Sequence, residues 1–136
     1  MIVVSDTSAI SALIKIGQVE LLYRLYGRVI VPSAVWAELT ILDIRYGYDL
    51  STLNEDWFEV VSIRNHELFK QYLSVLDEGE SEALVLTQEL NADLLLIDEM
   101  KGRKVAESIG IRYTGVLGIL LSAKSKGGIY LQFNRF

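Results

Sequence analysis

Two short apolar runs that each end in an acidic residue place the strongest constraint on how this chain folds. Residues 2–5 (Ile-Val-Val-Ser) lead into Asp6, and residues 94–97 (Leu-Leu-Leu-Ile) lead into Asp98 and Glu99. A continuous apolar run of this length is typical of a strand that is buried on both faces of a parallel sheet. In open α/β sheets the functional crevice lies at the carboxyl ends of the strands. The two runs therefore predict a parallel sheet with acidic side chains at one edge.

Helical and strand-like patterns alternate along the whole chain. Helices are predicted at residues 9–16, 19–26, 33–39, 66–75, 81–90, 101–108 and 115–126, and strands at residues 2–5, 28–31, 58–62, 94–97 and 111–113. Residues 40–56 are predicted to be irregular or weakly helical, residues 77–80 to form a turn, and Ser81 to cap a helix, while the tail to Phe136 fits no single class. The alternation predicts one α/β domain over residues 1–136, with a mostly parallel central sheet and helices on both faces.

The composition excludes several classes of protein. The chain contains no cysteine, which rules out a disulfide scaffold, a thiolate zinc site and a cysteine nucleophile. The N-terminus lacks the basic region of a secretory signal, and no stretch reaches the ~18 apolar residues of a membrane span. We therefore expect a cytoplasmic protein with no membrane association. The formal charge of -5 argues against simple attraction to nucleic acid, unless acidic residues hold cations that invert the local field.

Two further acidic positions fall in helices that adjoin the predicted strands. Glu38 lies in the helix that follows residues 28–31, and Glu82 lies in the helix that precedes residues 94–97. A cluster of carboxylates repels itself unless protons or cations intervene, and ligand sets made only of oxygen suit Mg²⁺ or Mn²⁺. Such ions activate water for phosphodiester hydrolysis without a histidine, cysteine or serine nucleophile. This chemistry suits a chain with a single histidine.

The order and spacing of these motifs resemble those of PIN-domain ribonucleases, particularly the VapC-like toxins and their relatives. The resemblance covers nearly the whole chain. Residues 3–8 (Val-Val-Ser-Asp-Thr-Ser) are similar to the family's opening strand and first acid, and residues 31–39 (Val-Pro-Ser-Ala-Val-Trp-Ala-Glu-Leu) to its second. Residues 79–84 (Gly-Glu-Ser-Glu-Ala-Leu), followed by residues 95–99 (Leu-Leu-Ile-Asp-Glu), resemble a subgroup with a Gly-Glu-x-Glu signature.

The resemblance implies a metal-dependent endoribonuclease that hydrolyses RNA phosphodiester bonds. The catalytic and metal-binding acids that it implies are Asp6, Glu38, Glu82 and Asp98, and the hydroxyls that it places near the metal to position substrate are those of Thr7 and Ser8. It further implies Mg²⁺ or Mn²⁺ as cofactor, RNA as substrate, and a homodimer held inactive by an antitoxin protein. A catalytically silent PIN fold that binds RNA or a protein is the alternative function.

The sequence departs from the commoner toxin pattern at the third and fourth acids. A Glu replaces the usual Asp at the third position, and Asp98-Glu99 replaces a Thr-x-Asp motif at the fourth. A turn or a one-residue shift exchanges which carboxylate faces the crevice. Glu80 is therefore the alternative to Glu82, and Glu99 is the alternative to Asp98.

Each of these charged residues also has a purely structural interpretation. Asp6 and Asp98 suit helix N-caps, and Glu38 suits a solvated helix surface. The acids at positions 78, 80 and 82 form a favourable charge cluster at a helix N-terminus. The cations at positions 101, 103 and 104 either contact RNA phosphate or form a solvated helix face. A receiver-like or phosphatase-like domain is disfavoured, because no second Asp stands two residues after Asp6.

Overall fold

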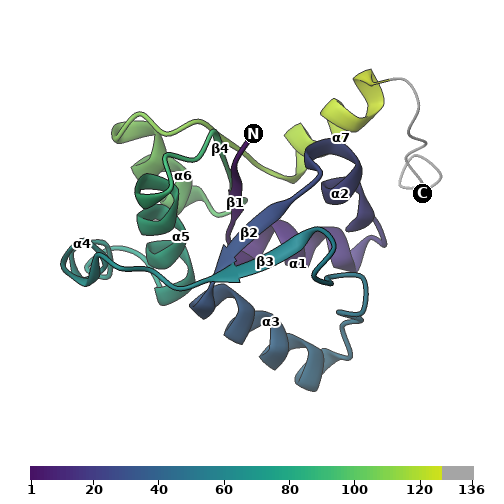
Figure 1. Ribbon diagram of the computed structural model, residues 1–136, viewed down its shortest axis with the longest axis horizontal. Coiled ribbons are helices and arrows are strands. Elements are labelled where there is room, and N and C mark those ends of the chain that lie inside the picture. The colour runs from purple at the N-terminus through teal and green to yellow at the C-terminus, as the bar shows by residue number, and fades with distance from the viewer. Residues whose placement is uncertain (127–136) are drawn as a thin grey trace.

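The computed structural model describes residues 1–126 and shows one α/β domain built around a five-stranded sheet (Figure 1). The tail to Phe136, which the sequence did not assign, lies outside the described residues. The strands are β1 (Val3–Ser5), β2 (Val29–Pro32), β3 (Phe58–Val61), β4 (Leu94–Leu96) and β5 (Tyr113–Thr114). The helices are α1 (Thr7–Lys15), α2 (Glu20–Tyr26), α3 (Ser33–Tyr46), α4 (His66–Tyr72), α5 (Glu78–Glu89), α6 (Met100–Ser108) and α7 (Val116–Ser125).

The sheet places β1 at its centre, in the order β3-β2-β1-β4-β5, and every neighbouring pair is parallel. Val4 lies opposite Ile30 of β2 on one side and opposite Leu95 of β4 on the other. Because all strands run the same way, the carboxyl ends of β1 and β4 lie side by side. The prediction of a parallel sheet with helices on both faces is confirmed.

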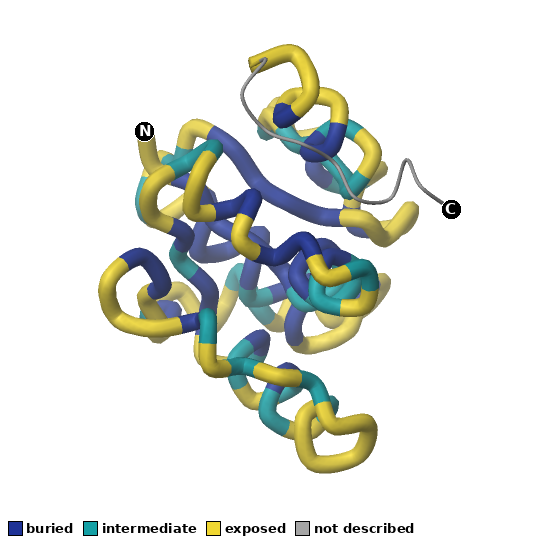
Figure 2. Tube along the Cα trace, turned by 90° about the vertical axis from the view of Figure 1, so that its right-hand side faces the viewer, coloured by how far each residue is buried: buried dark blue, intermediate teal, exposed yellow. Residues whose placement is uncertain are grey.

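Two hydrophobic cores, one on each face of the sheet, hold the layers together. Val3 and Leu96 pack into the core formed with α1, α2, α3 and α7. Val4, Leu95 and Ile97 pack into the opposite core, formed mainly with α5. Successive side chains of a strand point to opposite faces, so a strand covered on both sides must be apolar throughout. Figure 2 shows the buried segments running through the middle of the molecule, with exposed turns around them.

The helix predicted at residues 33–39 is longer than expected, because α3 continues through Tyr46, so the first part of the segment predicted to be irregular or weakly helical is regular helix. The helix ends at Gly47, which adopts the left-handed conformation (φ 68°) that glycine tolerates best. The last turns of α3 project from the domain, and Ile44 is 83% exposed. Since this half of the helix has little contact with the core, it lacks the apolar periodicity that marks a packed helix.

The prediction of a turn at residues 77–80 was wrong, because these residues begin α5. Asp77, rather than Ser81, is the N-cap: its carboxylate accepts the backbone N–H of Glu80 at 2.8 Å. The carboxylate of Glu80 in turn accepts the backbone N–H of Asp77 at 3.1 Å, which completes a capping box. Gly79 sits inside this first turn and gave the segment the composition of a loop.

The other predicted elements are present, with small shifts at their ends. The helix predicted at residues 66–75 ends at Tyr72, and the one predicted from residue 9 already begins at Thr7. Within residues 1–126, no helix has both the length and the apolar character needed to cross a bilayer.

Candidate functional site

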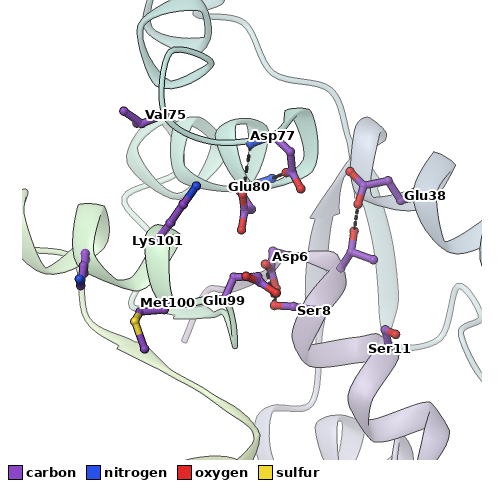
Figure 3. Close-up of a pocket in the computed structure, with 12 residues that line it drawn as sticks. Asp6, Ser8, Ser11, Glu38, Val75, Asp77, Glu80, Glu99, Met100 and Lys101 are labelled. Atoms are coloured by element: carbon purple, nitrogen blue, oxygen red, sulfur yellow. Dashed lines mark hydrogen bonds between the residues drawn. The ribbon is translucent and has the colours of Figure 1, made fainter.

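A cleft of about 810 Å³ opens where β1 and β4 end. Its walls come from the beginnings of α1, α5 and α6 and from the middle of α3 (Figure 3). Among the described residues, the acidic side chains that line it are Asp6, Glu38, Asp77, Glu80 and Glu99. The predicted convergence of acids at the carboxyl edge of the sheet is therefore present.

Asp6 occupies the most buried position in this cleft. The residue is 1% exposed, and its backbone N–H donates to the carbonyl of Leu96 at 3.0 Å, which ties the end of β1 to β4. Its carboxylate accepts the hydroxyl of Ser8 at 2.8 Å and the backbone N–H of Ala9 at 3.3 Å. Asp6 thus caps α1 and lines the cleft at the same time, so the structural interpretation of this residue does not exclude the functional one.

Burial raises the pKa of Asp6 from the ordinary 3.8 to about 7. The hydrogen bonds from Ser8 and Ala9 oppose this rise, whereas the negative charges of Glu80 and Asp77 add to it. An ionised Asp6 is therefore unfavourable in the free cleft, and a cation beside it would relieve that cost.

Glu38 reaches the cleft from α3, on the side opposite α6. Its carboxylate accepts the hydroxyl of Thr7 at 2.6 Å, which joins the start of α1 to α3. Burial raises the pKa of Glu38, while hydrogen bonds from Thr7 and from the backbone of Gly79 lower it. A Cβ added at Gly79 would lie 2.9 Å from the carboxyl carbon of Glu38, so any larger residue here would displace the Glu38 carboxylate from its present position.

Glu80 and Glu99 supply the third and fourth carboxylates of the cleft. Glu80 is 9% exposed, and burial raises its pKa, as do the negative charges of Asp77 and Glu99. Glu99 is exposed at the N-terminus of α6, and its side chain makes no capping hydrogen bond there. Figure 3 shows the Glu80 side chain extending from α5 toward Asp6 and Glu99, which are drawn next to each other.

The structure places Glu82 and Asp98, the preferred third and fourth acids of the sequence analysis, outside the lining of this cleft. Glu82 accepts the backbone N–H of Ala34 at 3.0 Å, at the N-terminus of α3. The Asp98 carboxylate accepts the backbone N–H of Val116 at 3.0 Å, at the N-terminus of α7. Both side chains therefore offset the positive end of a neighbouring helix. Their alternatives, Glu80 and Glu99, are the residues that join Asp6 and Glu38.

Ser8 links Asp6, which lines the cleft, to Asp98, which does not. Its hydroxyl donates to the Asp6 carboxylate and accepts the backbone N–H of Asp98 at 2.9 Å. Sequence reasoning did not place Asp77 in the cleft, although the Asp77-x-x-Glu80 spacing is a capping-box signal that also positions Glu80.

The acidic side chains that line the cleft offer only carboxylate oxygens as ligands, and oxygen ligands suit a hard divalent cation. Within residues 1–126, no three His, Cys, Asp or Glu side chains gather closely enough to hold an ion among themselves. Mg²⁺ usually keeps several waters and binds through one or two carboxylates together with substrate phosphate oxygens. The donor chemistry therefore fits a water-rich ion held by a pair of carboxylates, and does not fit a cage made wholly of protein ligands.

Comparisons with known proteins agree with this fold. A family model described as a PIN domain matches residues 2–135. A PilT N-terminus domain protein from the hyperthermophilic archaeon Sulfolobus solfataricus P2 has a similar solved structure, with a TM-score of 0.62 over 97% of this chain and 98% of that chain. The two sequences are 19% identical, so the likeness concerns the fold alone. No curated protein matches the chain.

Proposed function

Because this chain belongs to the PIN-domain family, we propose that it is a metal-dependent endoribonuclease that hydrolyses RNA phosphodiester bonds. The observation that carries the proposal is the cleft at the carboxyl ends of β1 and β4, which Asp6, Glu38, Glu80 and Glu99 line from four different segments. Family membership supports a nuclease, and the acidic cleft supports one that works with a cation rather than with a side-chain nucleophile.

We assign direct cation binding to a pair of carboxylates, Asp6 with either Glu80 or Glu99, and we assign the remaining acids of the cleft, including Glu38, to contacts with the waters of the same ion. A bound Mg²⁺ or Mn²⁺ would neutralise phosphate charge and lower the pKa of a water that attacks the phosphorus. The role of Ser8 is to orient the Asp6 carboxylate, and the role of Thr7 is to orient that of Glu38. Both hydroxyls thus act through the acids to which they donate, which keeps the carboxylates aligned before substrate arrives.

Cleavage of a fluorescent RNA by the purified protein tests this proposal, with Mn²⁺, Mg²⁺ or EDTA present and with Asp6→Asn beside the wild type. We expect cleavage with either ion, none in EDTA, and a loss of roughly a hundredfold in Asp6→Asn, the upper end of the losses typical of disturbed metal sites. Circular dichroism confirms that the variant is folded. Cleavage that persists in EDTA, or in Asp6→Asn at the wild-type rate, contradicts the proposal.

A catalytically silent PIN fold that binds RNA or a protein is the second candidate. It is favoured by one observation: within the part of the chain that the structure describes, no three potential ligands are assembled for a metal ion. Isothermal titration with Mn²⁺ distinguishes the two functions. RNA binding without any Mn²⁺ affinity supports the silent fold, whereas Mn²⁺ binding that Asp6→Asn abolishes supports the nuclease.

We further propose that the protein acts in the cytoplasm as the toxin of a toxin–antitoxin pair and forms a homodimer. The resemblance to VapC-like toxins supports this role. The exposed apolar surface of α3, where Ile41, Ile44 and Tyr46 are 49%, 83% and 68% exposed, supports the dimer. Light scattering should give twice the 15.3 kDa mass of one chain. A monomer at micromolar concentration contradicts the dimer.

A further inference from the structure

The cleft carries two cations as well as its acids. Lys101 and Lys104 of α6 both line it, and both are exposed. Residues three apart lie on the same face of a helix, so the two ammonium groups rise from one side of α6. Figure 3 shows the Lys101 side chain extending from α6 toward the start of α5. One wall of an otherwise acidic cleft is therefore basic.

These two lysines are not engaged by the acids around them. None of the ion pairs within residues 1–126 includes Lys101 or Lys104, although Glu80 and Glu99 line the same cleft. Their ammonium groups are thus available to an anion that enters from solvent.

The charge pattern inside α6 does not support the helix, although the acidic Glu99 stands at its N-cap. Its first turn holds Lys101 and Arg103 and no acid, and its last turn holds no base. The N-terminus of a helix carries a partial positive charge, so cations there are unfavourable for the helix itself. The lysines consequently add to a positive potential beside the cleft instead of supporting α6.

Arg103 provides an internal contrast. Its guanidinium carbon lies 5.5 Å from the ring centroid of Tyr113, on the β5 side of α6, and the residue does not line the cleft. The cations of α6 therefore lie on different sides of the helix. Arg103 packs on an aromatic ring, whereas Lys101 and Lys104 lie beside the acids of the cleft.

We infer that Lys101 and Lys104 are positioning residues that hold backbone phosphates of RNA beside the acids of the cleft. The identity of the substrate rests on the proposed nuclease function. A phosphate that approaches Asp6, Glu80 and Glu99 is repelled, and cations on the adjacent wall offset this repulsion. A lysine that contacts phosphate adds affinity without reading the base, so both residues contribute binding that is independent of sequence.

Fluorescence anisotropy with a labelled single-stranded RNA tests this inference, with every variant made in the Asp6→Asn background so that the probe stays intact. We expect Lys101→Ala/Lys104→Ala to weaken binding roughly tenfold or more at low salt. The slope of log affinity against log salt should become shallower by about 1.4, roughly 0.7 for each lost phosphate contact. Lys101→Arg/Lys104→Arg should bind like the reference, because the charge is kept.

The matched control is Lys15→Ala/Lys124→Ala, which removes two exposed lysines that do not line the cleft. Unchanged affinity and salt slope in the Lys101→Ala/Lys104→Ala variant overturn the inference, as does an equal loss in the control or a reference protein that binds no RNA. If Lys101→Ala/Lys104→Ala keeps the reference slope of log affinity against log salt while the wild type cleaves RNA, the lysines do not hold phosphates and the proposed nuclease function stands. If the slope changes as expected but the wild type cleaves no RNA, the two lysines do bind RNA phosphates and the proposed nuclease function is wrong.

Discussion

At the scale of single residues, the balance of charge around Asp6 determines what the cleft can do. A buried carboxylate is unfavourable unless hydrogen bonds, a proton or a cation compensates its charge. Ser8 and Ala9 donate hydrogen bonds, yet the pKa of Asp6 is still raised to about 7. The remaining cost comes from burial and from neighbouring acids, and a divalent cation beside the carboxylate would offset both. This is why Asp6 is central to the proposed metal site.

The free energy of unfolding of the metal-free protein should fall as pH rises from about 4 to about 7. Across this window Asp6 is protonated in the folded state, where its pKa is about 7, and ionised in the unfolded state, where its pKa is near 3.8. The folded state therefore binds more protons, and one such group decreases stability by up to ~1.4 kcal/mol per pH unit. Urea denaturation in EDTA at several pH values measures this slope. Asp6→Asn should make it shallower, and an identical slope in that variant would show that another group is responsible.

Glu99→Gln should impair catalysis, whereas Asp98→Asn should not. Glu99 lines the cleft, so losing its charge should lower cleavage by roughly 10–100-fold and leave stability unchanged. Asp98→Asn should retain cleavage, because an amide oxygen can still accept the Val116 N–H at the start of α7. Initial cleavage rates and urea midpoints of both variants check this. Loss of cleavage in Asp98→Asn but not in Glu99→Gln would mean that Asp98, and not Glu99, is the fourth acid of the catalytic site.

The sequence predicts Asp6 and Glu38 but does not decide between the paired acids that follow. Glu80 and Glu82 stand two residues apart in α5, so they point to sides of the helix that differ by about 200°. Which of them faces the cleft depends on how α5 is rotated against the sheet. That rotation is set by packing, and partly by the close approach of Gly79 to Glu38, which a single sequence does not reveal.

At the scale of elements, the contact between α3 and α5 depends on Gly79. Gly79→Ala should lower cleavage and change stability little, because its added Cβ would displace the Glu38 carboxylate, the flexible end of that side chain, rather than the backbone. In a Glu38→Ala background, Gly79→Ala should have a more favourable effect on the free energy of unfolding, since the carboxylate is absent and alanine is a better helix former than glycine. A double-mutant cycle by urea denaturation measures the coupling. Strictly additive effects would mean that the two residues do not constrain each other.

Elements with two packed faces are the ones that the sequence predicts best. β1 and β4 are apolar throughout because both of their faces are covered, and this leaves a clear signal. The second half of α3 packs on little, and its exposed Ile41 and Ile44 follow no core-facing period. The start of α5 depends on a capping box around a glycine, whose composition imitates a turn. The wrong predictions thus fall where tertiary contacts or caps, rather than periodicity, fix the element.

At the scale of the whole molecule, the class of fold follows from alternation, whereas the order of the strands does not. Strands separated by helices require parallel crossovers, which predicts the sheet and its two helical layers. The sequence contains no comparable signal that β4 lies beside β1 rather than beside β3. That arrangement brings the acids after β1 and β4 into one cleft, so the site depends on the strand order as much as on the residues.

Cation binding should stabilise the whole domain. An ion that binds only the folded state raises the free energy of unfolding by about 2.7 kcal/mol at a hundredfold excess over its Kd. Thermal denaturation with and without Mn²⁺ should therefore show a higher Tm for the wild type and no shift for Asp6→Asn. A shift of equal size in that variant would locate the ion away from Asp6.

The most direct test of the proposed catalytic cleft is the rate of Mn²⁺-dependent RNA cleavage by Glu80→Gln compared with Glu82→Gln. The two substitutions are chemically the same and lie in the same helix, but only Glu80 lines the cleft, while Glu82 accepts the Ala34 N–H. We predict a loss of roughly 10–100-fold for Glu80→Gln and nearly normal cleavage for Glu82→Gln. Normal cleavage by Glu80→Gln, with activity lost in Glu82→Gln, would contradict the assignment of this cleft as the catalytic centre.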